Sequence, residues 1–162
     1  ANPCKCGYLF DPARACARVP MCGEDYLGRI SGPLMDRFDI RIDVPPVSLS
    51  DLDLPAGGTS SAEVSQNVAI ARAIQAERFA NVTTMHLNAD AEGTVLEEIA
   101  APDEEGRSFL LKAADKFGLT ARGYHRILRV ARTIADLAGS SAVRKPHIAE
   151  AVSFRVNGTA GD

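Results

Sequence analysis

The sequence predicts a mainly α-helical fold, in which a helical bundle over residues 61–155 follows the end of an α/β domain over residues 1–50. Beyond residue 60, apolar residues recur at the three- and four-residue spacing of helices that bury one face. Before it, residues 39–44 alternate apolar and charged residues with the period-2 pattern of a half-buried strand. Because one strand needs neighbours to form a sheet, residues 1–50 are expected to be only part of a domain.

The region between these two parts has the composition of a linker. Residues 45–60 are rich in Pro, Gly, Ser and Asp, and the linker itself is placed at residues 51–60. Two consecutive prolines end the predicted strand, because proline cannot donate to a β-ladder. A short helix is expected around residues 24–30, and a disordered tail is expected over residues 156–162.

Capping residues mark the helices of the bundle. Ser60 and Glu63 have the spacing of a capping box, which predicts a helix from about residue 62 to residue 79. Asp103 and Thr120 are typical N-caps, and Pro146 suits a first helical position. Further helices are therefore expected over residues 94–100, 104–117, 120–138 and 147–154.

Two of these helices show clear apolar faces. In the first helix the face consists of Val64, Val68, Ala71 and Ile74 or Gln75. The helix over residues 120–138 has the strongest stripe, formed by Tyr124, Ile127, Leu128, Ala131, Ile134, Ala135 and Leu137 or Ala138. Both stripes are expected to face a core.

The composition is that of a globular chain with 46% hydrophobic and 24% charged residues in 162. No apolar run approaches the roughly 18 residues of a membrane span, so no membrane contact and a cytoplasmic location are expected. The chain opens on Ala-Asn-Pro and not on Met, which indicates a piece of a longer protein. Residues 119–162 carry seven Lys/Arg against three Asp/Glu, an excess that suits either a polyanionic partner or an ordinary solvated face.

Four short motifs follow one another along the chain. They are Asn2-Pro-Cys-x-Cys-Gly7, Ser31-Gly-Pro-Leu-x-Asp-Arg-Phe-Asp39, Thr120-x-Arg122 and Arg129-Val-Ala-Arg-Thr-Ile-Ala-Asp-Leu137. With these motifs the chain resembles the magnesium-chelatase-like ComM family of AAA+ ATPases over nearly its whole length. The resemblance implies that residues 61–155 are the helical lid of a AAA+ module. Residues 1–50 are then the C-terminal remnant of its α/β ATPase core, with a cysteine-rich loop, an arginine-finger helix and one strand.

The resemblance also implies an activity and partners. Members of such a family assemble into rings, here expected to be hexamers, which bind ATP with Mg²⁺ and release ADP. The work expected of the ring is DNA remodelling, with branch migration in natural transformation as the specific case. The chain has no Gly-x-x-x-x-Gly-Lys-Ser/Thr loop and no hydrophobic run that ends in Asp-Glu, so by itself it is not expected to hydrolyse ATP.

Three residues take functional roles through the resemblance. Asn2 matches the sensor-1 asparagine that orients the attacking water, and Arg37 matches an arginine finger that reaches the ATP site of a neighbouring subunit. Arg122 matches the sensor-2 arginine of the lid, which contacts nucleotide. Each residue also has a structural alternative: a turn at Asn2, an ion pair of Arg37 with Asp36 or Asp39, and solvation of Arg122 on its helix.

The four cysteines Cys4, Cys6, Cys16 and Cys22 form the pattern C-x-C-x9-C-x5-C. Four thiols this close together in a cytosolic chain favour a metal over disulfides, and a closed Cys₄ set is typical of structural zinc. Four reduced cysteines without a ligand remain the alternative.

A basic face is expected on the helix over residues 120–138, opposite its apolar stripe. Its members are Arg122, Arg126, Arg129 and His125 or Arg132. This face has three possible partners: nucleotide through Arg122, DNA phosphates through Arg126 and Arg129, or the acidic residues 97–105. Two other functions stay open, namely a helical DNA-binding module without a catalytic role and a magnesium chelatase subunit acting in metal insertion into porphyrin.

Overall fold

The computed structural model describes residues 2–44, 47, 49–53 and 57–156. It divides the chain into two compact units, Ala1–Phe38 and Asp39–Asp162, which are described separately here as unit 1 and unit 2. Of the tail expected over residues 156–162, Val156 ends the last helix and the remainder lies outside the described residues. In the described part of the chain, no helix has both the length and the hydrophobicity that a membrane span requires.

Unit 1 contains two short helices, α1 (Met21–Leu27) and α2 (Gly32–Met35). The helix expected around residues 24–30 therefore begins and ends earlier than predicted. It follows Pro20, and the N–H of Gly28 donates to the carbonyl of Glu24 at 2.7 Å to close its last turn. Outside these helices, unit 1 consists of turns and coil.

The strand predicted over residues 39–44 does not form, since these residues have no strand assignment in the structure. In this segment the N–H of Arg41 donates to the carbonyl of Phe154 at 2.8 Å, which is a contact to a helix and not to a strand. Among the described residues, the one β-type contact is an isolated parallel bridge between Pro102 and Val143. The alternating apolar and charged residues favour an extended conformation, but a β-ladder also requires a second strand. The expected linker contains a short helix, α3 (Leu49–Leu52).

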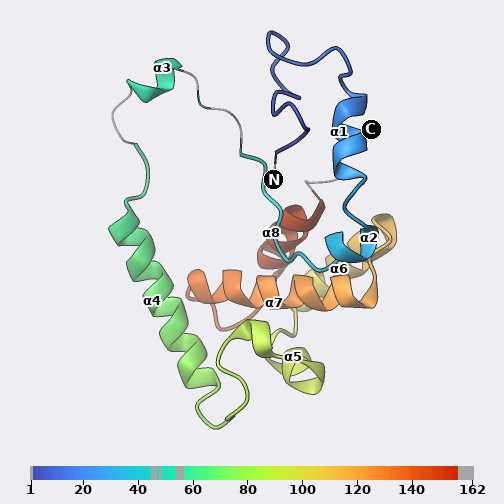
Figure 1. Ribbon diagram of the computed structural model, residues 1–162. Coiled ribbons are helices and arrows are strands. Elements are labelled where there is room, and N and C mark those ends of the chain that lie inside the picture. Colours follow the sequence, from blue (N-terminus) through green and yellow to red (C-terminus); the bar gives the residue numbers. More distant parts are fainter. Residues whose placement is uncertain (1, 45–46, 48, 54–56, 157–162) are drawn as a thin grey trace. The chain divides into compact units, whose positions relative to one another are not determined.

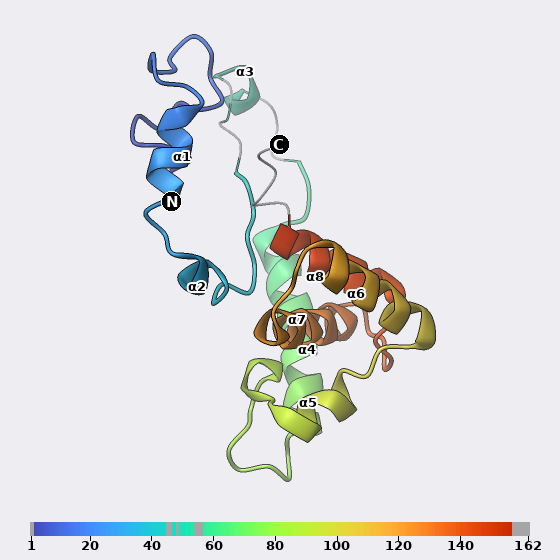
Figure 2. The same cartoon turned by 90° about the vertical axis from the view of Figure 1, so that its right-hand side faces the viewer.

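Unit 2 is the predicted helical bundle. Figures 1 and 2 show its helices, in which α7 is central: it packs against α4, η1, α5 and α8, while α8 also packs against α6. Their bounds are α4 (Ser61–Arg78), the 3₁₀ turn η1 (Asn88–Asp90), α5 (Gly93–Ile99), α6 (Glu104–Lys116), α7 (Ala121–Leu137) and α8 (Lys145–Val156).

The caps explain why these helices begin where they do. The predicted capping box is confirmed, because the Ser60 hydroxyl accepts from the N–H of Glu63 and the Glu63 carboxylate accepts from the N–H of Ser60. Asp103 and Thr120 cap α6 and α7 by accepting from the N–H groups of Gly106 and Gly123, without the reciprocal bond of a capping box. Gly139 follows α7 at φ +64°, a left-handed conformation that glycine adopts without steric cost.

The core of unit 2 forms around α7, as its stripe predicts. Ile127, Leu128, Ala131 and Ala135 are buried, and they belong to one core cluster with residues of α5, α6 and α8. The other core residues are Phe79, Ala91, Leu96, Ala100, Leu110, Ala113, Val143, Ile148, Ala151 and Val152. At the end of the stripe, Leu137 is 51% exposed, so the buried face ends one turn earlier than predicted.

Helix α4 buries less of its apolar face than its sequence predicts. Ala71 and Gln75 are buried, but Val64 and Val68 are about half exposed. Figure 1 shows the reason: α4 lies beside the other helices at its C-terminal end and extends away from them at its N-terminal end. Its first turns therefore leave much of their apolar face exposed.

A buried carboxylate, Asp136 of α7, joins three parts of unit 2. Arg78, at the end of α4, donates to both of its oxygens at 2.6 and 2.7 Å. Asn88 of η1 donates to it at 2.8 Å, and its backbone N–H donates to Gln75 of α4 at 3.1 Å. The side chain of Asp136 is 1% exposed, so these bonds replace water entirely.

Arg132 completes this buried cluster from the preceding turn of α7. Its guanidinium lies 2.9 Å from the carboxylate of Asp136. The same group donates to the carbonyls of Ser140 and Ser141 at 2.6 and 2.8 Å, which fixes the loop that leaves α7. The sequence placed Arg132 among the candidates for an exposed basic face, but its side chain is 3% exposed and points into the bundle.

The Asp136 cluster is expected to stabilise unit 2 strongly. Replacing Asp136 with Asn leaves the guanidinium groups of Arg78 and Arg132 partly buried without a counter-charge, and removing one partner of a buried pair costs about 3–5 kcal/mol. Urea unfolding followed by helical circular dichroism measures this loss. Asp115→Asn is the matched control, because Asp115 is an exposed aspartate on α6. Equal stability of the two variants would contradict the role assigned to Asp136.

The same carboxylate gives a pH dependence with a defined sign. Burial by itself raises the pKa of Asp136, but hydrogen bonds from Arg78 and Asn88 and the charge of Arg132 outweigh it and lower the pKa below its ordinary value. Its contribution is therefore full above the unfolded pKa of about 3.9 and is lost as the pH falls through the lower folded pKa. The difference in unfolding free energy between wild type and Asp136→Asn should shrink from pH 6 to about pH 3. A constant difference would show that another group carries the effect.

Candidate functional site

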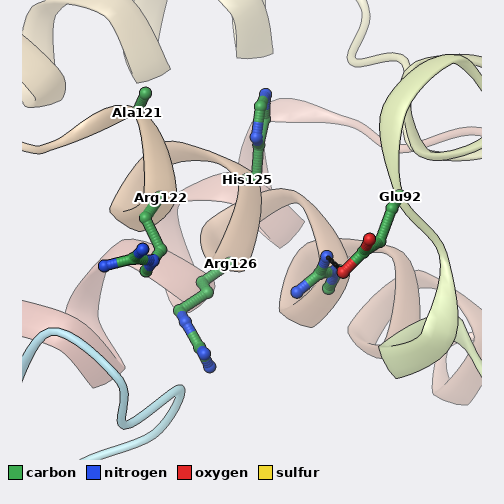
Figure 3. Close-up of a pocket in the computed structure, with 6 residues that line it drawn as sticks. Glu92, Ala121, Arg122, His125 and Arg126 are labelled. Carbon is green, nitrogen blue, oxygen red and sulfur yellow. Dashed lines mark hydrogen bonds and ion pairs between the residues drawn. The ribbon is translucent and has the colours of Figure 1, made fainter.

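A solvent-filled hollow of about 360 Å³ lies at the N-terminal end of α7. Its lining is strongly basic, and Glu92 is the only acidic member. Figure 3 shows Arg122 and Arg126 extending from the same side of α7, whereas His125 points the opposite way. The complete lining is Glu92, Ala121, Arg122, His125, Arg126 and Arg129. Since the first turn of a helix carries a partial positive charge, this end of α7 suits an anion.

Two of the lining arginines already have partners in the protein. Arg126 forms an ion pair with Asp39 at 2.5 Å. Arg129 donates to the carbonyl of Ala91 at 2.9 Å and lies 3.4 Å from the carboxylate of Glu92. Both side chains are only about one-fifth exposed, so each guanidinium serves first to fix a neighbouring segment to α7.

Arg122 differs from these two arginines. It is exposed, and within the described residues no hydrogen bond or ion pair engages its guanidinium. The local fold also places it firmly, because the Thr120 cap lies two residues before it and Gly123, one residue after it, is packed against Arg155. A Cβ at Gly123 would lie 3.1 Å from the guanidinium of Arg155, so this turn of α7 is closely packed. The structure thus presents one available guanidinium on a fixed helix end.

Asn2 and Arg37 lie in unit 1, whereas Arg122 lies in unit 2. Asn2 is exposed and stands in coil. Arg37 is exposed in the turn that follows α2, and its N–H donates to the carbonyl of Leu34 at 3.0 Å. The structural alternative for Arg37 was a pair with Asp36 or Asp39, but within the described residues its guanidinium forms no ion pair, and Asp39 pairs with Arg126.

The predicted cysteine site is assembled within unit 1. The sulfur atoms of Cys4, Cys6 and Cys22 lie within 4.8 Å of one another, and those of Cys4 and Cys6 are 3.1 Å apart. Cys4 is fully buried, Cys22 is 8% exposed, and all four cysteines are free of disulfides. Cys16 is half-buried and is near enough to affect the pKa of Cys6 and of Cys22, but its sulfur does not lie within 4.8 Å of all three others.

The electrostatics of these thiols differ from one another. A hydrogen bond from Cys4, together with the backbone of Tyr8 and of Cys16, lowers the pKa of Cys6 to about 6. Burial, followed by the neighbouring Cys16, raises the pKa of Cys22 to about 12. One thiol is therefore ready to ionise, whereas a buried neighbour resists ionisation unless a cation accompanies it.

Two family models match the chain. The model described as "Magnesium chelatase, subunit ChlI C-terminal" matches residues 58–155, and the model described as "Magnesium chelatase, subunit ChlI" matches residues 1–52. The chain belongs to the magnesium-chelatase-like ComM/YifB family. The mainly α-helical fold agrees with the helical C-terminal domain of this family.

Relatives in this family are much longer than the chain. It is 41% identical over 131 residues to "Competence protein ComM" of Haemophilus influenzae, which is 80% of this chain and 25% of the relative. It is 38% identical over 157 residues to "Uncharacterized protein YifB" of Escherichia coli, which is 95% of this chain and 29% of the relative. The ComM/YifB-family chain thus spans less than a third of the length of these relatives.

Sequence reasoning missed the Asp136 cluster as a group, although it lies on α7, the helix that carries the candidate site. One signal was present: Arg132 and Asp136 are four residues apart, the spacing of an ion pair on one helix face. Asp136 also directly follows the buried Ala135. The partner Arg78 is 58 positions away in the sequence, and no local pattern of this ComM/YifB-family chain indicates it.

Proposed function

We propose that this chain is the lid and the adjoining core segment of a ring-forming ATPase that couples ATP hydrolysis to DNA remodelling in the cytoplasm. The observation that carries the proposal is Arg122 at the N-terminal end of α7, beside a basic hollow, where its guanidinium has no partner among the residues that the structure describes. Membership of the family supports the wider assignment. The hydrolysis itself and the hexameric ring belong to the whole protein. The matched relatives are about three times as long as this chain.

In this proposal, Arg122 reports the presence of a nucleotide phosphate to the lid. A guanidinium suits the task because it stays charged and offers a rigid set of N–H donors to phosphate oxygens. Helix α7 connects that contact to the rest of unit 2, since it packs against α4, α5 and α8. A displacement of the N-terminal end of α7 is therefore transmitted to the helices that pack against it.

Arg37 and Asn2 act at the nucleotide from unit 1. Arg37 is exposed, and its guanidinium forms no ion pair with any described residue, as a residue that reaches into a neighbouring subunit requires. Asn2 offers an amide that positions the attacking water. ATP brings the phosphoanhydride bond and Mg²⁺ neutralises its phosphates, whereas the residues of this chain bind, orient and sense the phosphate groups.

Two other functions can be distinguished from the proposed motor by experiment. A DNA-binding module requires Arg126 and Arg129 to contact phosphates, yet both already pair with carboxylates of unit 2. A chelatase role, in metal insertion into porphyrin, is supported by the match to family models for a magnesium chelatase subunit. The relative named as a competence protein favours DNA as the substrate. ATP turnover that DNA stimulates and porphyrin does not would support the proposed motor.

Arg122→Ala is expected to lower ATP turnover of the full-length protein by roughly 10²-fold, as removal of one preorganised donor does. Nucleotide affinity should fall as well, because the contact is to the bound phosphate. Steady-state hydrolysis and a fluorescent-nucleotide titration measure the two effects. Arg107→Ala is the matched control, since Arg107 is an exposed arginine on α6 away from the hollow. If Arg122→Ala instead leaves turnover unchanged and flattens the salt dependence of DNA binding by about one counterion, the DNA-binding module is correct.

Arg37→Ala is expected to abolish turnover, by roughly 10³- to 10⁵-fold, while nucleotide binding is retained. An arginine finger stabilises charge in the transition state and belongs to the adjacent subunit, so its loss should also affect wild-type neighbours. Mixed rings with increasing fractions of Arg37→Ala subunits test this. The expected loss of activity is steeper than the mutant fraction. Arg29→Ala is the control, because Arg29 is an exposed arginine between α1 and α2. Loss in simple proportion, with normal hydrolysis by the pure variant, would remove Arg37 from this role.

A further inference from the structure

Unit 1 has no hydrophobic core of the ordinary kind. Within its described residues the buried side chains are those of Cys4 and Cys22, while large apolar side chains such as Phe10 and Met21 are 72% and 61% exposed. A compact unit of this size rarely buries enough apolar surface to be stable, and units below about 40 residues usually depend on disulfides or metals. The centre of unit 1 therefore consists of thiols.

The fold brings these thiols together from three separate places. Cys4 and Cys6 come from the first turn of the chain, Cys16 from the following loop, and Cys22 from the start of α1. The loop closes tightly on α1, because a Cβ at Gly23 would lie 2.8 Å from the Cδ2 atom of Leu9. Glycine next to Cys22 thus allows the close approach of this loop to the start of α1, where the sulfurs of Cys4, Cys6 and Cys22 form one group.

We propose that Cys4, Cys6, Cys16 and Cys22 bind one Zn²⁺ as a closed tetrathiolate site that holds unit 1 together. With Zn–S bonds of about 2.3 Å, the sulfurs of a tetrahedral site lie about 3.8 Å apart. The sulfurs of Cys4, Cys6 and Cys22 lie within 4.8 Å of one another, so small side-chain shifts are sufficient to bind the ion.

The burial of the group also fits a structural site. Cys4 is fully buried and Cys22 is 8% exposed, so a metal held by these sulfurs is shielded from water. On binding, the metal displaces the thiol protons to solvent, and no electron is transferred.

A disulfide fits this group less well. Cys4 and Cys6 are separated by a single residue, and their sulfurs are 3.1 Å apart, well beyond the roughly 2.05 Å of a covalent bond. A disulfide between Cys4 and Cys6 would also leave out Cys16 and Cys22, whereas one zinc ion uses all four sulfurs. The two possibilities differ in the number of titratable thiols, which makes them easy to separate.

The test is metal analysis of the 162-residue chain prepared without chelator, together with reconstitution by Co²⁺ as a spectroscopic probe. The expected result is about one zinc per chain and, with Co²⁺, the visible bands of a tetrahedral ion and the strong charge-transfer absorption of four thiolates. Cys4→Ser and Cys16→Ser should each lower zinc affinity by more than the roughly 10- to 100-fold that loss of a second-shell group costs. Met21→Leu is the matched control, because Met21 adjoins Cys22 but is exposed.

Three results would overturn the proposal. Zinc near zero with four freely titratable thiols in the native chain would show unliganded cysteines, and zinc near zero with two thiols missing would show a disulfide. Full zinc affinity in Cys16→Ser would show that the site is not closed by four sulfurs. Helical circular dichroism of unit 2 shows whether a variant is otherwise folded, and the cobalt spectrum of the wild-type chain tests the site even if a cysteine variant is unstable.

Discussion

The buried carboxylate of Asp136 is the interaction on which unit 2 most depends. It holds Arg78 at the end of α4, Asn88 in η1 and Arg132 in α7, and Arg132 in turn fixes the carbonyls after α7. Hydrophobic contact contributes less to holding α4 in place. The first half of α4 is exposed, so few apolar side chains hold that helix to α7. A fully satisfied charged cluster can replace such contact, because each lost partner would leave a buried charge.

Local patterns predicted the helices of unit 2 well, because caps and apolar periodicity act over a few residues. Ser60, Asp103 and Thr120 cap the helices that the sequence assigned to them, and the stripe of α7 lies in the core. The strand predicted at residues 39–44 does not form, because a strand depends on contacts with residues that are distant in the sequence. Strand formation depends on a partner strand, and residues 39–44 contact α8 through Arg41 instead. Propensity without a partner does not make a sheet.

The candidate site was predictable as a list of residue types but not as an arrangement. The spacing of Arg122, Arg126 and Arg129 placed them on one helix, yet their roles separate only in three dimensions. Two are neutralised by Asp39 and Glu92, which lie 87 and 37 positions away, and only Arg122 keeps an available guanidinium in the described structure. The cysteine group shows the converse case, in which a spacing pattern alone indicated four cysteines, and the fold brings the sulfurs of Cys4, Cys6 and Cys22 within 4.8 Å of one another.

The position of Arg122 relative to Asp136 gives α7 a mechanical asymmetry. The two residues are fourteen positions apart, about 21 Å along a helix that rises 1.5 Å per residue. The Asp136 end is buried and bonded to α4 and η1, while the Arg122 end faces a solvent-filled hollow. In the proposed ATPase, a phosphate bound at Arg122 acts on the exposed N-terminal end of α7, and the Asp136 cluster ties the other end to α4 and η1. The bundle then moves with α7 as one body, because loosening the helix from α4 requires breaking a buried ion pair.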